Sequence, residues 1–275
     1  MGKQKGVPFL IAMRCYLLCL IATLALAADL KKDIEFSRPG GLPLTLDASI
    51  PAGKGPHPAV IIVHGGGFIG GDKQTYVPPL FPPLTEAGFA WFSINYRLAP
   101  EHKFPAQIED VKAAFEFVLK NAKEYNIDTR RIALIGESAG ASIIAYYAVT
   151  AKGKLRPRAV VNLYGVTDWE FNRDELGKLS EGASAWLGTT SLKTASAMTY
   201  VKKDMPPFLF IHGTKDPQVP FPNSPRMCSA MRLAGASCEV LTVEGGGHGM
   251  GGWEKVPAFQ AYKKKMVEWL NETMR

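Results

Sequence analysis

The sequence predicts an α/β fold, in which a mostly parallel central sheet has helices on both faces. Short apolar runs alternate along the chain with segments whose apolar residues recur at helical spacing. The apolar runs are continuous, as is typical of strands that are buried on both faces. Neither an internal repeat nor a low-complexity linker interrupts this order, so we expect residues 28–275 to form a single domain.

The elements follow one another in a regular order. A loosely alternating stretch at 34–50, with Gly40-Gly41 at its centre, predicts an opening hairpin. Residues 76–87 are interrupted by prolines and are expected to be partly helical. Further strands are expected at 58–63, 89–94, 131–135, 159–163, 208–211 and 239–243. Helices are expected at 106–124, 138–151, 224–234 and 256–273. The stretch 166–203 is the least regular, and we expect it to form a small irregular cap or rim.

The first 27 residues are typical of a signal peptide. Three basic residues and no acidic residue occur there, the stretch 15–28 is uncharged, and Ala25-Leu26-Ala27 forms a small-x-small site. The apolar run is short for a membrane span of about 20 residues, although an uncleaved anchor is the alternative. We therefore expect a secreted or periplasmic protein that has no membrane contact after the leader is cleaved.

The charge of the chain does not indicate a nucleic-acid partner. The formal net charge is +7, and removal of the three basic leader residues leaves +4. A modest positive charge spread along the chain is not the footprint of a nucleic-acid-binding protein. The densest run, Lys263-Lys264-Lys265, lies on a predicted helix, and we interpret it as a solvated face.

The cysteines leave two alternatives. Two of the four lie in the predicted leader, and the remainder of the chain keeps Cys228 and Cys238. A pair of cysteines in an exported protein is consistent with a disulfide bond or with two separate buried thiols.

Residues 136–140 read G-E-S-A-G, between a predicted strand and a predicted helix. This context is that of the nucleophile elbow, a sharp turn that exposes a serine hydroxyl at the carboxyl end of a strand. Gly136 and Gly140 remove Cβ atoms where the strand and the helix come close. Ser138 is therefore the candidate nucleophile, and an inert loop serine is the alternative.

A serine nucleophile needs a base, and on this type of sheet the base follows the serine and the acid in the chain. Of the five histidines, only His212 and His248 come after Ser138. His248 lies in a glycine-rich loop after the last predicted strand, where it can reach across to the serine. We predict His248 as the base and expect His212 to pack or to form hydrogen bonds locally.

The acid that orients the base is expected at the end of the preceding strand. Asp216 follows the run 208–213 and is our candidate. Asp168 is the main rival, with Asp174 and Asp204 behind it. The carboxylates that do not serve this role are expected to be turn or cap residues.

The run His64-Gly65-Gly66-Gly67-Phe68 follows the first buried strand. Its glycines leave backbone N–H groups free to face a developing oxyanion. The expected donors are the N–H groups of Gly66, Gly67 and Ala139, and we interpret His64 as a residue that shapes the loop.

Metal and cofactor chemistry is not expected. The histidines are not at ligand spacing, no C-x-x-C occurs, and no glycine run is followed by G-K-[ST].

At this point the chain resembles the α/β-hydrolases, in particular the hormone-sensitive-lipase-like (HGGG) esterases and especially the secreted bacterial acetyl xylan and feruloyl esterases. The stretches that carry the resemblance are HGGGF (64–68), NYRLAPEHKFPAQ (95–107), GESAG (136–140), PPFLFIHGTKDPQVP (206–220) and EGGGHG (244–249). It implies the same site residues and a small ester or acylated polysaccharide as substrate. Within 95–107 we expect Arg97 to pair with a carboxylate as a structural brace.

The chain also departs from the lipase-like pattern. Little sequence precedes the HGGGF strand once the leader is removed, so we expect no large N-terminal cap and an open acyl site. Trp169, Trp186 and Trp253 are candidates to line the site and stack on a sugar or aryl ring, and core packing is the alternative for each.

Together these observations predict a secreted serine hydrolase that cleaves short-chain acetyl or feruloyl esters of plant polysaccharide through an acyl-enzyme. An amide hydrolase, such as an exported peptidase, would use the same three residues. A binding module on an inactive hydrolase fold is the alternative from another class.

Overall fold

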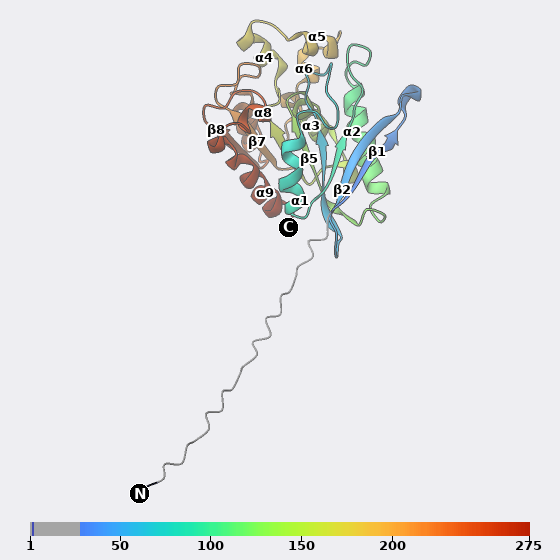
Figure 1. Ribbon diagram of the computed structural model, residues 1–275. Helices are drawn as coiled ribbons and strands as arrows, with labels where there is room; N and C mark the ends of the chain where they lie inside the picture. Colours follow the sequence, from blue (N-terminus) through green and yellow to red (C-terminus); the bar gives the residue numbers. More distant parts are fainter. Residues whose placement is uncertain (1, 3–27) are drawn as a thin grey trace.

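The computed structural model describes residue 2 and residues 28–275 (Figure 1). The predicted signal peptide at 1–27 therefore lies outside the described residues, apart from Gly2. None of the helices in the described ranges is long and apolar enough to cross a bilayer.

One eight-stranded sheet forms the centre of the molecule. Its strand order is β1-β2-β4-β3-β5-β6-β7-β8. The first two strands are antiparallel to their neighbours, and the other six run parallel. The prediction of a mostly parallel sheet is confirmed. The strands are β1 (Asp29–Ser37), β2 (Leu44–Ile50), β3 (His57–Val63), β4 (Ala90–Ile94), β5 (Ile127–Glu137), β6 (Ala159–Leu163), β7 (Phe208–Gly213) and β8 (Cys238–Val243).

Helices pack on both faces of this sheet. The α-helices are α1 (Phe81–Glu86), α2 (Ala106–Lys120), α3 (Ala139–Thr150), α4 (Trp169–Leu176), α5 (Glu181–Leu187), α6 (Leu192–Ala195), α7 (Asn223–Leu233), α8 (Met250–Trp253) and α9 (Ala261–Thr273). Short 3₁₀ turns are η1 (Pro39–Gly41), η2 (Pro78–Leu80), η3 (Gly153–Leu155), η4 (Ala197–Tyr200) and η5 (Pro257–Phe259).

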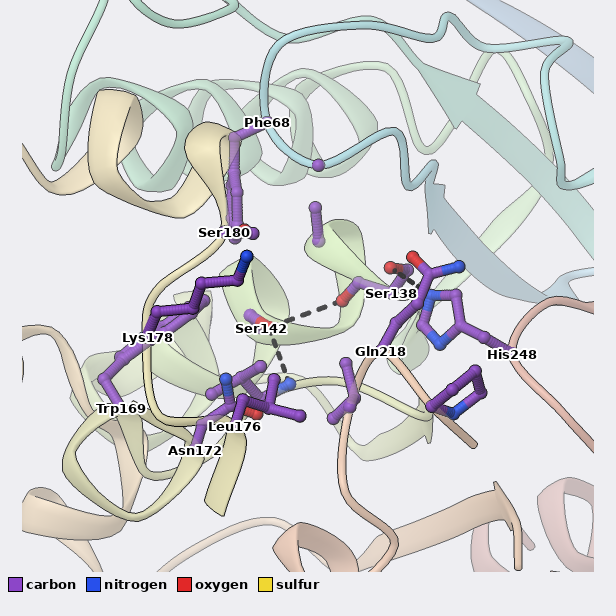
Figure 2. Close-up of a pocket in the computed structure, with 15 residues that line it drawn as sticks. Phe68, Ser138, Ser142, Trp169, Asn172, Leu176, Lys178, Ser180, Gln218 and His248 are labelled. Carbon is purple, nitrogen blue, oxygen red and sulfur yellow. Dashed lines mark hydrogen bonds between the residues drawn. The ribbon is translucent and has the colours of Figure 1, made fainter. Parts of the chain in front are cut away.

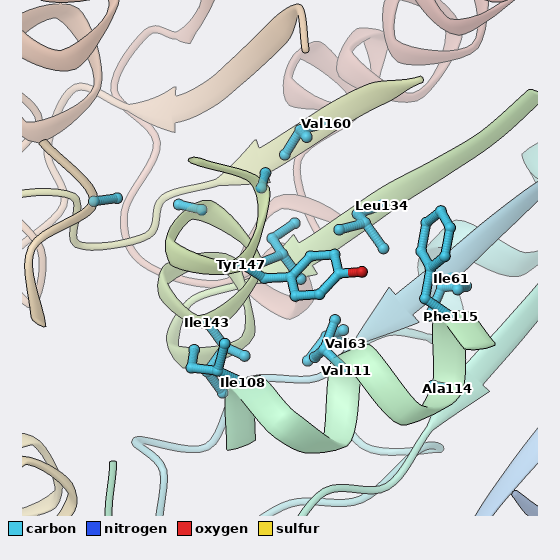
Figure 3. Packing of buried hydrophobic residues seen from close by; sticks show 14 of the residues in the cluster. Ile61, Val63, Ile108, Val111, Ala114, Phe115, Leu134, Ile143, Tyr147 and Val160 are labelled. Carbon is cyan, nitrogen blue, oxygen red and sulfur yellow. The ribbon is translucent and has the colours of Figure 1, made fainter. Parts of the chain in front are cut away.

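The core consists of two apolar layers, one on each face of the sheet. In β3, Ile61 and Val63 pack in one layer, while Val60 and Ile62 pack in the other. Helices α2, α3 and α7 contribute to the first layer, part of which is shown in Figure 3. Helices α1, α8 and α9 contribute to the second. Burial on both faces explains why the strands are continuous apolar runs.

Several element boundaries differ from the prediction, among them the starts of β1 and α9, and two others have a physical reason. Strand β5 begins at Ile127, four residues before the predicted start at Arg131. The polar side chains in between concealed it, because Asp128, Arg130 and Arg131 interrupt the apolar run; in the structure Asp128 pairs with both arginines. Helix α2 ends at Lys120 rather than at residue 124, since the chain turns there toward Asn126, whose φ is positive.

The stretch 166–203 was expected to be irregular. In the structure it contains three short α-helices. Each helix has an N-cap side chain that accepts a hydrogen bond from a backbone N–H: Asp168 from Phe171, Ser180 from Ala183 and Ser191 from Thr194. Helices this short lack the long periodic pattern that reveals a helix in a sequence. They lie together at the top of the view in Figure 1.

A disulfide bond joins Cys228 on α7 to Cys238 at the start of β8. The structure therefore decides between the two alternatives that the sequence left open. The bridge closes a short loop, with a sequence separation of 10.

Replacing Cys228 and Cys238 together with Ala is expected to lower the free energy of unfolding by about 2–3 kcal/mol, because the unfolded chain regains the entropy of this short loop. Urea unfolding of both proteins without reductant measures the difference. With reductant present the two midpoints should converge. A midpoint that is unchanged by the double substitution would contradict the bond.

Candidate active site

Ser138 lies at a sharp turn between β5 and α3. Its φ is 51° and its ψ is −115°, a conformation that residues other than glycine rarely adopt. A Cβ on Gly136 would lie 2.6 Å from the carbonyl oxygen of Gly140. A Cβ on Gly140 would overlap the carbonyl oxygen of Val63. The turn therefore requires both glycines, and it lifts the serine hydroxyl above the carboxyl end of the sheet.

Ser138, His248 and Asp216 form a continuous hydrogen-bonded chain. The Ser138 hydroxyl is 2.8 Å from His248 Nε2, and His248 Nδ1 is 2.7 Å from Asp216 Oδ2. Because a carboxylate only accepts hydrogen bonds, Nδ1 carries a proton and Nε2 is left to accept the serine proton. The structure thus brings together the three residues that the sequence singled out, from the ends of β5, β7 and β8.

Three further groups hold the Asp216 carboxylate. Oδ1 accepts the backbone N–H groups of Gln218 at 2.8 Å and Val219 at 2.9 Å. His212 Nε2 lies 3.4 Å from Oδ2. Burial raises the pKa of Asp216, but the hydrogen bonds from His212 and His248 outweigh it and keep the pKa below its usual range. The carboxyl therefore stays ionised.

His212 is fully buried beside this carboxylate. Its Nε2 donates to the carbonyl of Val219 at 3.0 Å, and its Nδ1 accepts from the Ser224 hydroxyl at 2.8 Å. These are the local hydrogen bonds expected from the sequence. What the sequence analysis missed is the contact with Asp216, although the spacing of four residues was visible.

Two of the three predicted oxyanion donors line the pocket at Ser138. They are Gly67 and Ala139, whose N–H groups have no hydrogen-bond acceptor among the described residues. Gly66 does not line the pocket. Its carbonyl accepts the N–H groups of Ile69 at 3.2 Å and Gly70 at 3.1 Å, so it closes the turn. The Gly66 N–H has no hydrogen-bond acceptor among the described residues, so its role as a third donor stays a prediction.

His64 holds this loop in place. Its ring stacks on Tyr96 with the centroids 4.3 Å apart, and its Nδ1 donates to the Gly65 carbonyl at 2.7 Å. Burial lowers the pKa of His64 to about 4, so the ring is neutral near pH 7.

Arg97 braces the chain after β4 against α2. Its Nε donates to Asp110 at 2.9 Å, and its guanidinium also lies 3.0 Å from Glu109. The predicted pairing with a carboxylate is confirmed.

A pocket of about 300 Å³ opens at Ser138 (Figure 2). His248 lies on one side of it, and residues between β6 and β7 form the opposite wall. That wall consists of Val166, Trp169, Asn172, Leu176, Lys178 and Ser180. Apart from Trp169, sequence reasoning singled out none of these residues, because no local pattern indicates which side chains of a short helical segment face a pocket.

The tryptophans divide between the pocket and the core. Trp169 lines the pocket, as predicted. Trp186 is fully buried and stacks on Phe68 with the centroids 4.2 Å apart. Trp253 is 1% exposed and does not line the pocket. Its Nε1 donates to the Gly247 carbonyl at 2.9 Å, next to His248. The tentative role of Trp253 in substrate binding is corrected: it supports the histidine loop from within the core.

Within residues 28–275, no group of three or more His, Cys, Asp or Glu side chains is arranged to hold a metal ion.

Glu137 is a buried carboxyl that the sequence analysis did not consider. It precedes Ser138 and is 3% exposed, and its Oε2 has no hydrogen-bond partner in the described part of the chain. A Cβ on Gly65 would overlap this oxygen, so the glycine loop makes room for it. Burial raises the pKa of Glu137 to about 7.

Replacing Glu137 with Gln is expected to change how stability depends on pH. In the wild type the pKa rises from 4.5 to about 7 on folding, so the folded state retains a proton in this window. The free energy of unfolding therefore falls as the pH rises from 4.5 to 7. The variant cannot ionise there, and its stability relative to wild type should rise by up to about 3 kcal/mol over this window.

Urea unfolding at several values between pH 4.5 and 8 measures this difference. The exposed Glu170→Gln variant controls for the loss of one negative charge. Parallel stability curves for wild type and Glu137→Gln would show that Glu137 does not titrate in this range.

Comparison with known proteins identifies the family. The family model BD-FAE matches residues 46–231, more than half of the chain. The chain belongs to the BD-FAE family. The resemblance to α/β-hydrolase esterases, and to feruloyl and acetyl xylan esterases among them, is thereby confirmed.

Curated relatives of this BD-FAE member include bacterial esterases. Esterase LipQ of Mycobacterium tuberculosis is 33% identical over 198 residues, which cover 66% of this chain and 47% of LipQ. Esterase LipC of the same organism is 29% identical over 214 residues, which cover 70% of this chain and 53% of LipC. The matched region spans about half the length of these relatives.

Solved structures also resemble the chain. A truncated carbohydrate esterase from gut microbiota superimposes with a TM-score of 0.78 at 27% identity, covering 91% of this chain and 98% of that one. A bifunctional GH43-CE protein of Bacteroides eggerthii gives a TM-score of 0.77 at 27% identity, covering 90% and 35%. An esterase of Pyrobaculum calidifontis, with a TM-score of 0.76 at 24% identity and coverage of 90% and 86%, shows the α/β-hydrolase fold.

Proposed function

We propose that this member of the BD-FAE family is a serine esterase that removes acetyl or feruloyl groups from plant polysaccharide. The observation that carries the proposal is the hydrogen-bonded chain from Asp216 through His248 to Ser138, which opens on a pocket with two unpaired backbone N–H groups.

The reaction follows from this geometry. The oxygen of Ser138 attacks the acyl carbon while His248 Nε2 takes the serine proton. Asp216 orients the ring and stabilises its cationic form. The N–H groups of Gly67 and Ala139 donate to the oxyanion of the tetrahedral intermediate. His248 then returns the proton to the leaving alcohol. A water molecule, activated by the same histidine, releases the acid and restores Ser138.

The pocket supports a small acyl group. Its volume of about 300 Å³ lies at the low end for ligand sites, so it suits an acetyl group or one aryl ring better than a long acyl chain. Phe68, Val166 and Trp169 provide apolar surface for that group. The polysaccharide is supported by the family and by the carbohydrate esterase among the similar structures.

We further propose that the protein is exported to the periplasm or beyond the cell. The signal-peptide pattern at 1–27 supports export. The disulfide between Cys228 and Cys238 supports an oxidising compartment, because cytosolic thiols are kept reduced.

Labelling with a serine-directed aryl phosphonate tests the chemistry. Wild type should gain one phosphonyl group at Ser138, seen by peptide mass analysis, and Ser138→Ala should gain none. A wild-type protein that takes no label would indicate a binding module rather than an esterase.

A substrate series tests the acyl group. We expect kcat/KM to fall from p-nitrophenyl acetate to butyrate to octanoate, with methyl ferulate and acetylated xylan also hydrolysed. Octanoate preferred over acetate, with acetylated xylan left intact, would overturn the substrate assignment. Faster hydrolysis of the matching p-nitroanilide would indicate an amide hydrolase.

A further inference from the structure

A second cleft, of about 390 Å³, lies at the end of the sheet opposite to Ser138, where the parallel strands begin. Residues 129–132, 153–158 and 205–207 contribute to its lining. Arg158 precedes β6 and Pro207 precedes β7, so the cleft lies at the amino ends of the parallel strands. Ser138 follows the carboxyl end of β5. The two sites are therefore separated by the length of the sheet.

Among the residues that the structure describes, four cations and no carboxylate line this cleft. The cations are Arg130, Lys154, Arg156 and Arg158, all exposed to solvent, and together they define what we call the basic cleft. The sequence did not reveal it, because its charges come from two separate segments. The run Lys263-Lys264-Lys265 is denser in the sequence, but it does not line this cleft.

Most of the charged side chains of the basic cleft are not held in ion pairs within the described part of the chain, so they are available to bind a ligand. Lys154 and Arg158 have no ion-pair partner among residues 28–275. Arg156 donates to the backbone carbonyl of Asp204, whose carboxylate does not line the cleft. Arg130 pairs with Asp128 at 3.1 Å, yet its side chain remains 87% exposed.

The backbone beneath these side chains is fixed. The N–H of Arg158 donates to the carbonyl of Ile132 at 2.7 Å, and the N–H of Val160 donates to that of Pro207 at 3.0 Å. Pro157 and Pro206 are buried between these links. Because prolines restrict the chain and the links join three segments, binding does not have to order the backbone that carries the cations.

We propose that the basic cleft binds an anionic polysaccharide, a chain that carries uronic-acid carboxylates, and so anchors the esterase to plant cell-wall material. Guanidinium groups pair with carboxylates through parallel hydrogen bonds, and three of the four cations are arginines. A site at the far edge of the sheet leaves the Ser138 pocket free for the ester. The choice of a polysaccharide rests on the proposed function.

The lining favours a polysaccharide over a nucleic acid. Sites for single-stranded nucleic acids stack bases on aromatic side chains. No aromatic residue of the described part of the chain lines the basic cleft, where the uncharged lining includes Thr129, Ile132 and Met205.

Fluorescence anisotropy with labelled oligogalacturonate tests the anchor, with a labelled xylo-oligosaccharide as the neutral probe. Wild type should bind the oligogalacturonate, more weakly as NaCl is added, and should not bind the neutral probe. The Lys154→Gln/Arg158→Gln variant should bind it at least about tenfold more weakly, since two unpaired cations are lost. Lys264→Gln/Lys265→Gln removes the same charge from α9 and should bind within about twofold of wild type.

Three results would overturn the inference. Equal loss of affinity in both variants would show a general attraction between opposite charges. Equal binding of the neutral probe would show that carboxylates are not recognised, and equal binding of oligothymidylate would indicate a nucleic-acid site. Hydrolysis of p-nitrophenyl acetate by the same proteins keeps the two proposals apart. An active wild-type esterase that does not bind oligogalacturonate would refute the anchor alone, and an inactive protein that binds it would refute the esterase.

Discussion

Replacing Asp216 with Asn is expected to lower kcat for p-nitrophenyl acetate by about 10⁴-fold, with little change in KM. Oδ1 accepts two backbone N–H groups, so in the variant the amide oxygen must occupy that position. The amide NH₂ then faces His248 Nδ1, where the carboxylate accepted a hydrogen bond. The ring has to present Nδ1 as an acceptor and move its proton to Nε2. In that tautomer it cannot take the proton of Ser138.

The rival carboxylate provides a matched control. Asp168→Asn makes the same chemical change at the N-cap of α4, where Asn caps a helix as well as Asp does. We expect its kcat to stay within about threefold of wild type. Steady-state kinetics of both variants, with urea unfolding to verify their folding, decides the assignment. If Asp168→Asn lost more activity than Asp216→Asn, the acid would have been assigned to the wrong residue.

Replacing Gly182 with Ala is expected to lower kcat by about 10²-fold, although Gly182 is far from Ser138 in the sequence. Gly182 lies in α5, where its backbone is suitable for alanine. The new Cβ would overlap the carbonyl oxygen of Gly67. A backbone carbonyl cannot turn away as a side chain can, so Gly67, whose own N–H is the oxyanion donor, has to shift. A shift of this donor affects the transition state more than the bound ester, and KM should change little.

Gly252→Ala is the control for this substitution. It lies in the short helix α8, and a Cβ there meets no atom within 4 Å. Its kcat should match wild type, and both variants should unfold at similar urea concentrations. An unchanged kcat in Gly182→Ala would mean that α5 does not hold the loop in place.

Much of the fold and the chain of three residues could be predicted from the sequence because both leave local signals. Strands that are buried on both faces appear as continuous apolar runs, as in β3 and β6. The elbow at Ser138 needs Gly136 and Gly140, and the order of acid and base along the chain follows from the sheet.

The features that the sequence did not reveal depend on contacts between distant segments. Nothing near Glu137 in the chain shows that its carboxyl is enclosed by the glycine loop, because Gly65 is remote in sequence. Trp253 could not be assigned to the core or the pocket, since its partners Tyr164 and Tyr262 come from other elements. The basic cleft likewise appears only when the segments near Arg130 and Arg158 meet.

The pocket wall that contacts the substrate and the residues that react with it come from different parts of the fold. Ser138, Asp216 and His248 follow β5, β7 and β8, while Trp169 and Lys178 belong to a connection that contributes no strand to the sheet. Outside the contact between Gly182 and the Gly67 loop, this connection can therefore change its length or composition without altering the strands that place the reacting groups. One sheet with a fixed serine, histidine and aspartate could in this way serve esters of different shape, and exchange of residues 166–203 between relatives is the shortest route to a new substrate.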